Sequence, residues 1–159
     1  HSPFTNLQCR TAAEKPDSSA ALLFALAAHH AQSGQQERAA TLFARCLERQ
    51  PDFRRARKNL ALLQLQTEAY DAAAANVAVL ISGGEGGDAA TWKLLGYARF
   101  LAGEVRAAEA AYRTAYALNP DDEEIRRGLI RTRLQLGRAA EARELIEEER
   151  ARHPQDAAL

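Results

Sequence analysis

Several residue types are scarce in this 159-residue chain, and each shortage excludes a class of protein. The two cysteines are too few for the disulfide framework of a small secreted domain. Acidic and basic side chains balance at 21 each, so no net field attracts nucleic acid or an anionic membrane surface. The longest apolar run, Ala20 to Ala28, is about half of the roughly 18 residues that a membrane-spanning helix needs. The sequence therefore predicts no nucleic-acid partner and no direct membrane insertion.

Methionine is absent, and lysine occurs only at Lys15, Lys58 and Lys93. The missing methionine predicts a processed form or a fragment of a longer chain. The excess of arginine and alanine favours a bacterial source, and the compartment stays open between bacterial cytoplasm and periplasm. Cys46 is expected to be a buried thiol, with a bond to Cys9 as the alternative.

A small residue returns at a nearly fixed interval, and neighbouring columns keep the same spacing. The alanines Ala39, Ala73, Ala108 and Ala142 are 34, 35 and 34 residues apart. Two apolar columns run in register with them: Leu26, Leu60, Leu95 and Leu129, then Phe43, Val77, Tyr112 and Ile146. The glycines Gly34, Gly103 and Gly137 fall where a turn is expected. A period of this length indicates a repeated helical hairpin, each copy burying its apolar face against the next.

The helical pattern divides the chain into four repeats between two short flanks. Residues 1–18 are interpreted as an extension or a degenerate helix, and residues 155–159 as a tail. The array at 19–154 is predicted to contain repeats at about 19–53, 54–87, 88–120 and 121–154. Asp88 is the expected N-cap of the third repeat. The run from Gly83 to Gly87 lacks the ending of a phosphate-binding loop, so it is predicted to be a flexible turn between repeats.

No group of residues suggests catalysis. His29 and His30 are adjacent on a predicted helix, so they point about 100 degrees apart and do not form the i, i+4 pair of a metal site. The sequence also lacks the serine-nucleophile, zinc-protease and paired-cysteine motifs. We therefore expect no catalytic residue, no metal and no cofactor.

The third repeat resembles the tetratricopeptide repeat, a 34-residue helix-turn-helix. Trp92, Leu95 and Gly96, followed by Ala108, Tyr112 and Pro120, match the family signature of W-x2-L-G, alanine, an aromatic residue and proline. The other repeats depart from it, with Leu23, Arg57 and Arg126 in place of tryptophan, Ile130 at the column of Gly96, and Glu85 where proline is expected. The resemblance covers about residues 19–154. It implies an all-α solenoid, a right-handed superhelix of helical hairpins whose concave face is formed by the first helix of each pair.

The resemblance also implies which first-helix residues face the groove. These positions combine apolar and aromatic anchors with several cations: Phe24, Ala28, Arg55, Lys58, Leu62, Leu65, Lys93, Tyr97, Phe100, Arg127, Arg131 and Leu134. Such a surface predicts a protein or peptide partner that is apolar with some acidic residues. The alternative is that Leu62, Leu65 and Phe100 are ordinary core between helices and that the arginines are merely solvated.

One specialised function of the family is not expected. Its chaperone-binding members hold a terminal carboxylate with a clamp of lysines, asparagines and arginine. Lys58 matches the first lysine, but Leu62 and Leu94 occupy the asparagine places. Recognition of heat-shock chaperone tails is therefore not predicted.

The resulting hypothesis is a protein-interaction scaffold in a bacterial assembly, such as a secretion, pilus or polysaccharide-export machine. Two alternatives stay open: a secretion chaperone for one client, and a regulatory domain cut from a larger enzyme. The polar column residue Glu149, beside Glu147 and Glu148, predicts that the fourth repeat caps the array and that the protein is a monomer. Charge swaps on the outer helices, such as Glu109→Lys or Arg143→Glu, are expected to affect partner binding little.

Overall fold

The computed structural model describes residues 18–83 and 86–154, and in these ranges the regular elements are helices, with no strand. Three predicted segments lie partly or wholly outside the described residues. They are the N-terminal extension with Cys9, the turn predicted at 83–87, whose residues 84–85 are not described, and the C-terminal tail. The chain divides into two compact units, unit 1 (His1–Gly86) and unit 2 (Gly87–Leu159).

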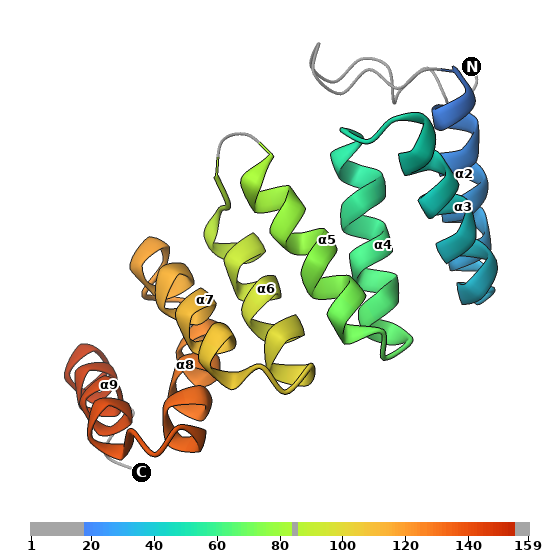
Figure 1. Cartoon of the computed structure of the whole chain (residues 1–159). Coiled ribbons are helices and arrows are strands. Elements are labelled where there is room, and N and C mark those ends of the chain that lie inside the picture. Colours follow the sequence, from blue (N-terminus) through green and yellow to red (C-terminus); the bar gives the residue numbers. More distant parts are fainter. Residues whose placement is uncertain (1–17, 84–85, 155–159) are drawn as a thin grey trace. The chain divides into compact units, whose positions relative to one another are not determined.

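Each unit contains two helical hairpins, with the helices packed side by side in chain order (Figure 1). Unit 1 contains α2 (Ser18–Gln32), α3 (Gln36–Arg49), α4 (Arg54–Gln66) and α5 (Tyr70–Ser82); unit 2 contains α6 (Ala89–Leu101), α7 (Val105–Leu118), α8 (Glu123–Gln135) and α9 (Ala139–Arg152). None of these helices is long and apolar enough to cross a bilayer. The all-helical prediction is confirmed.

The turn inside each hairpin has the same left-handed residue. Gly34, Gly103 and Gly137 have φ of 76°, 82° and 76°, a conformation that costs glycine little. The second hairpin has Glu68 at this place, with φ of 62°. The residue that follows each of these four left-handed positions closes the turn by donating its N–H to the carbonyl five residues earlier. In the second hairpin, for example, the Ala69 N–H donates to the Gln64 carbonyl at 2.8 Å. The backbone therefore keeps the turn even where the repeat lacks its glycine.

Two aspartates start the first helices of unit 2. Asp88 accepts a hydrogen bond from the Thr91 N–H at 2.8 Å, which confirms it as the N-cap of α6. Asp122 caps α8 in the same way, accepting from the Ile125 N–H at 3.1 Å. These caps satisfy backbone donors that have no partner within the helix.

The alanine column is part of the buried core of both units. Ala39, Ala73, Ala108 and Ala142 are all fully buried, as expected from the period. In unit 1 an aromatic cluster fills the space beside this seam. The Phe24 ring lies 5.7 Å from that of Phe43 and 5.0 Å from that of Phe53. Small residues at the seam therefore let the helices approach, and larger ones fill the flanks.

In unit 2 one aromatic ring occupies a slot between two glycines. The Tyr112 side chain extends from α7, and a Cβ at Gly96 of α6 would lie 2.9 Å from its Cγ and Cδ2. A Cβ at Gly128 of α8 would overlap its Cε1 and Cζ. The slot thus requires glycine on both first helices. The glycine on α8 is Gly128, two residues before Ile130, which occupies the sequence column of Gly96.

Arginines at the signature tryptophan position connect each helix to the preceding turn. Arg57 donates to the Pro51 carbonyl at 2.9 Å and to the Asn76 side chain at 2.9 Å. Arg126, which is buried, donates to the Pro120 carbonyl at 3.0 Å and to Glu149 at 2.8 Å. The two arginines therefore replace the packing of tryptophan with hydrogen bonds to a turn and to the second helix of the same hairpin.

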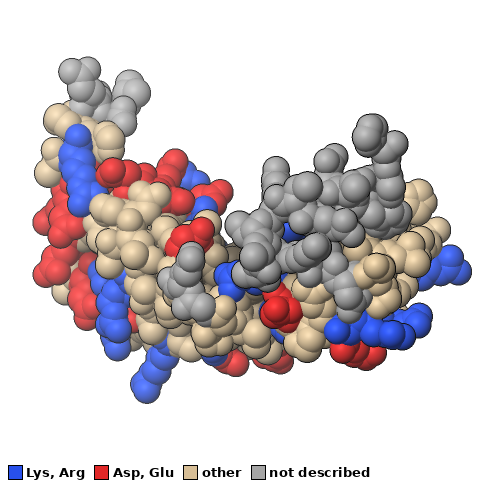
Figure 2. Space-filling model, turned by 90° about the horizontal axis from the view of Figure 1, so that it is seen from above, with Lys and Arg blue, Asp and Glu red and all other residues tan. Residues whose placement is uncertain are grey.

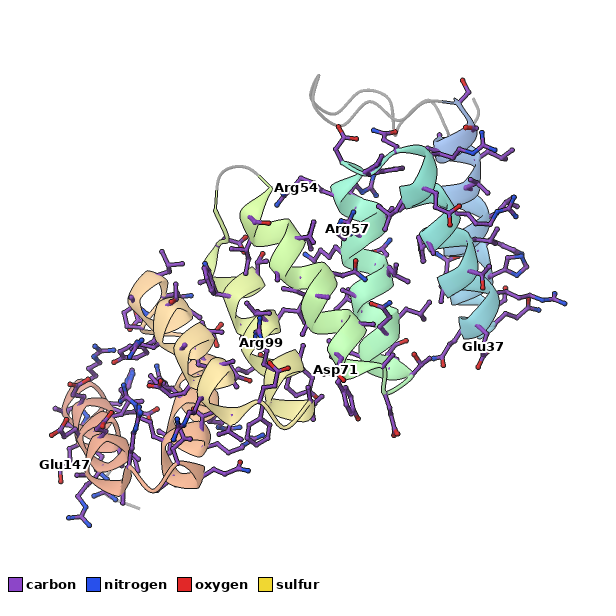
Figure 3. All side chains as sticks on the ribbon, in the orientation of Figure 1. Glu37, Arg54, Arg57, Asp71, Arg99 and Glu147 are labelled. Atoms are coloured by element: carbon purple, nitrogen blue, oxygen red, sulfur yellow. The ribbon has the colours of Figure 1, made fainter. Side chains whose placement is uncertain are left out.

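The exposure of three side chains could not be read from the sequence. Leu26, from an otherwise buried column, is 43% exposed, because no helix precedes α2 among the described residues. Glu109 is not solvated: it is 4% exposed, and its carboxylate lies 3.5 Å from Arg133 and 3.7 Å from Arg138. Glu149 is partly covered because it pairs with Arg126, whereas Glu147 projects from α9 into solvent (Figure 3).

Candidate binding surfaces

The predicted groove residues divide between the two units. Phe24, Arg55, Lys58 and Leu62 lie on α2 and α4 of unit 1. Lys93, Tyr97, Phe100, Arg127 and Arg131 lie on α6 and α8 of unit 2. Each set is therefore a separate candidate surface on a pair of first helices.

Unit 1 has an open groove between its first helices, called the unit 1 groove below. Its volume is about 250 Å³, and it is lined by Ala28, Ala31, Gln32, Phe43, Asn59, Leu62, Leu63 and Gln66. Leu62 is 39% exposed, so its side chain is available to another molecule. Three carboxamides, which both donate and accept hydrogen bonds, lie among the apolar groups. The sequence analysis named Leu62 and Ala28 but missed Gln32, Asn59 and Gln66, although their spacing along α2 and α4 places them on the same faces.

Phe24 lies deeper than a contact residue of this groove. Its ring is 5% exposed and belongs to the aromatic core of unit 1. The Arg55 guanidinium lies over the ring, with 5.3 Å between its Cζ and the ring centroid. This is the geometry of a cation–π interaction. Phe24 therefore positions Arg55 and offers little surface of its own.

The four cations that open α4 have different surroundings. Arg54 donates to the carbonyls of Leu80 and Gly83, and Arg57 to the groups described above, so both lie toward α5 (Figure 3). Arg55 and Lys58 are exposed and have no acidic partner among the described residues. Neither α2 nor α4 contains an acidic residue. Two positive charges beside the unit 1 groove therefore have no compensating carboxylate in the part of the chain that the structure describes.

Acidic and basic side chains are otherwise intermixed over the visible face of the molecule (Figure 2). On the first helices of unit 2, Lys93 of α6 bonds to Glu124 at 2.8 Å and to Asp122 at 3.1 Å. The hydrogen bond to Glu124 raises the pKa of Lys93, against a smaller opposing effect of burial. For Asp122, burial would raise the pKa, but hydrogen bonds from Ile125 and Lys93 together hold it below its ordinary value.

Arg127 is also paired, with Glu123 one turn earlier on α8. The predicted cationic surface of unit 2 is thus largely neutralised by Asp122, Glu123 and Glu124 at the start of α8. Arg131 differs, because its Cζ lies 5.4 Å from the Phe100 ring centroid and it has no acidic partner in the described part of the chain.

The unit 2 surface also offers exposed apolar groups. Tyr97 is 44% exposed on α6, and Leu134 on α8 is more than half exposed. Beneath them lies Tyr112, whose pKa burial raises to about 12, with Arg131 acting in the opposite direction. Tyr112 therefore stays a neutral phenol in the ordinary pH range. It was predicted only as a core position, since nothing in the period shows that two glycines bring its ring between the first helices.

The two surfaces present groups that can bind another molecule. Among the described residues no cluster of histidine, cysteine or carboxylate side chains could hold a metal ion. The unit 1 groove can accept an apolar side chain, hydrogen-bond to a peptide backbone through its carboxamides, and attract an anion to Arg55 and Lys58. The unit 2 surface offers an exposed tyrosine and an exposed leucine, together with Arg131, which has no acidic partner among the described residues.

Comparison with known proteins supports the all-α solenoid fold described above. Two family models, both described as tetratricopeptide repeat, match residues 20–63 and 99–159. No curated protein sequence matches the chain. The structure of MamA, residue 41 to the end, from Desulfovibrio magneticus RS-1 is similar with a TM-score of 0.73 and 21% identity, covering 89% of this chain and 81% of that one.

Two further solved structures share the fold. MamA from AMB-1 has a TM-score of 0.75 and 22% identity, over 80% of this chain and 69% of that one. The first tetratricopeptide domain of Spaghetti (RPAP3), bound to an HSP90 peptide, has a TM-score of 0.65 and 16% identity, over 75% of this chain and 94% of that one. At these identities the similarity shows a tetratricopeptide-type α-solenoid.

Proposed function

The chain belongs to the tetratricopeptide-repeat family, and from this premise we propose that it is a protein-interaction scaffold that holds a segment of a partner on its first-helix surfaces. The observation that carries the proposal is the unit 1 groove, which is open, apolar and lined with carboxamides. Concave surfaces of stacked repeats serve this purpose in helical solenoids. We propose no catalytic role.

The partner we propose is a protein segment with apolar side chains and some acidic ones. Leu62 and Tyr97 would contact the apolar groups, and the unpaired Arg55, Lys58 and Arg131 would attract the acidic ones. The RPAP3 domain holds a peptide of HSP90, so a related fold accommodates a short segment. A chaperone tail is not our proposal for this chain, because Leu62 and Leu94 stand where the carboxylate clamp needs asparagine.

The cellular setting we propose is a bacterial assembly. Its support is the composition of the chain, rich in arginine and alanine, and the structural similarity to MamA of Desulfovibrio magneticus. Secretion, pilus and polysaccharide-export machines are the candidate assemblies, and the groove is the feature that would join two of their components.

A selection from a phage-displayed library of random 16-residue peptides tests the proposal. We expect enriched peptides to bind the full chain with micromolar affinity, about 8 kcal/mol of binding free energy. Leu62→Glu should abolish this binding, because it places a charge in the unit 1 groove. Val79→Glu is the matched control, since Val79 is an exposed apolar residue of unit 1 that does not line the groove. The proposal would be refuted if the affinity of the selected peptides were unchanged by Leu62→Glu and by every substitution on the unit 2 surface.

A further inference from the structure

The first turns of α4 carry a charge distribution that its own fold does not explain. Arg54, Arg55, Arg57 and Lys58 all lie near the N-terminus of the helix, and the first turn has no acidic residue. The N-terminus of a helix is the positive end of its dipole, where anionic side chains are favourable and cations are not. The start of α8, with Glu123 and Glu124, has the favourable arrangement. The cations of α4 therefore need another reason.

Contacts within the described part of the chain account for only two of the four. Arg54 and Arg57 hold carbonyls and the Asn76 side chain, so they connect α4 to its neighbours. Arg55 rests on Phe24, which fixes its position without neutralising its charge. Lys58 lies on the next turn. The two remaining cations lie at the Phe24 end of the α2 and α4 faces that form the unit 1 groove.

On the basis of the proposed function, we propose that the unit 1 groove selects a partner segment in which a carboxylate side chain and an apolar side chain stand two residues apart. The carboxylate lies at Arg55 and Lys58, and the apolar group lies on Leu62. The occupant is an extended stretch of an acidic protein segment. Its backbone contacts the carboxamides of Asn59, Gln32 and Gln66, which line the same groove.

The spacing follows from the geometry of the two chains. Lys58 and Leu62 are four residues apart on one helix, which places them about 6 Å apart along the helix axis. In an extended peptide, side chains on the same face are two residues apart, about 6.6 Å. Adjacent residues point to opposite faces, and residues three apart do so as well. A separation of two therefore brings both groups onto the groove.

Among the described residues, two unpaired cations lie beside the unit 1 groove and one, Arg131, lies on the unit 2 surface, so unit 1 is the stronger site for an acidic group. On the unit 2 surface Lys93 and Arg127 are bonded to carboxylates of the chain itself. A partner carboxylate there would have to displace one of these. Arg55 and Lys58 need no such displacement, and a guanidinium can bind a carboxylate through two parallel hydrogen bonds.

The test uses a synthetic peptide, Gly-Ser-Gly-Glu-Ala-Leu-Gly-Ser-Gly, with both ends blocked so that no terminal carboxylate takes part. Binding to the full chain is measured by NMR titration. We expect replacing Glu with Gln to weaken binding about tenfold, which corresponds to losing one hydrogen-bonded charge pair. Replacing Leu with Ala should also weaken it. Peptides with the two residues adjacent or three apart should bind more weakly than the original. Equal binding of the Gln peptide overturns the inference.

Variants of the chain locate the contact. Lys58→Glu should weaken binding of the Glu peptide and restore binding of a peptide with Lys in place of Glu. Arg45→Glu is the matched control, because Arg45 is an exposed cation on α3 without a partner among the described residues, and binding should be unchanged. If Lys58→Glu and Arg45→Glu act alike, the carboxylate is not read by α4 and the inference fails. A phosphoserine peptide that binds more than tenfold tighter than the Glu peptide would likewise overturn the choice of a carboxylate.

The outcomes separate this inference from the proposed function. If peptide affinity falls on Leu62→Glu but does not change on Lys58→Glu, the scaffold proposal stands and the proposed recognition of a carboxylate is wrong. If the library yields no groove-dependent peptide and the synthetic peptides do not bind, both proposals are wrong.

Discussion

Gly128→Ala should destabilise the protein, although the same substitution in an ordinary helix is favourable. Alanine in place of glycine within a helix contributes about 1 kcal/mol of stability. Here the new methyl group would overlap Cε1 and Cζ of Tyr112, whose buried ring lies between α6 and α8. Overpacking of a filled core costs about 1 to 3 kcal/mol. We therefore expect a net loss of up to about 2 kcal/mol in the free energy of unfolding, measured by urea denaturation with circular dichroism.

The cause is isolated by a second substitution on α7. Tyr112→Leu removes Cε1 and Cζ, the two atoms that overlap most with the new methyl group, and keeps Cδ1, which would lie 2.8 Å from it, so Gly128→Ala should cost clearly less in this background than in the parent protein. Gly96→Ala is the matched control: the atoms next to it are Cγ and Cδ of Tyr112, which leucine keeps, so Tyr112→Leu should not relieve its cost. An increase in stability from Gly128→Ala alone, or the same cost in both backgrounds, would refute the slot between the glycines.

Four further substitutions test the fold. Glu68→Gly should raise the free energy of unfolding by about 1 kcal/mol, because glycine adopts the observed positive φ without strain. A lower stability of this variant in thermal or urea denaturation would contradict the expectation. Glu109→Gln should cost about 3 kcal/mol by leaving Arg133 and Arg138 without their buried partner, whereas Arg143→Glu should change stability by less than about 0.5 kcal/mol. The pKa of Tyr112 is raised to about 12, so its neutral phenol stabilises the folded state fully below pH 10, and this stabilisation is lost as pH rises toward 12. Tyr112→Phe should therefore lose less stability than the parent protein between about pH 10 and 12. Parallel plots of unfolding free energy against pH for the two proteins would show that the phenol is not the cause.

The period of the sequence was sufficient to predict the hairpins and their turns. The helical spacing and the breakers at Gly34, Gly103 and Gly137 determine local backbone geometry, which depends on residues close together in the chain. The same period places Glu68 at a left-handed turn, although its side chain alone would argue against it. The buried alanine column follows from the same rule, because a small residue at a fixed register marks the close contact of two helices.

The candidate surfaces were predicted only in part. First-helix positions such as Leu62 and Tyr97 could be assigned from the family pattern, and both are exposed. The pattern could not show that Phe24 is core beneath Arg55, because a position on a helix face does not give its depth. Nor did it indicate the groove carboxamides.

By itself the sequence determined the helices, their pairing into hairpins and the register of the small residues, all of which follow from local periodicity. Only the tertiary structure decided which charges remain unpaired. Lys93 is compensated by Asp122 and Glu124, about thirty residues away, and Glu109 is buried between α7, α8 and α9. Such pairings depend on how neighbouring helices align and on the direction of long side chains. A period of 34 residues does not encode either, so charge counting along the sequence overestimated the free cations of unit 2.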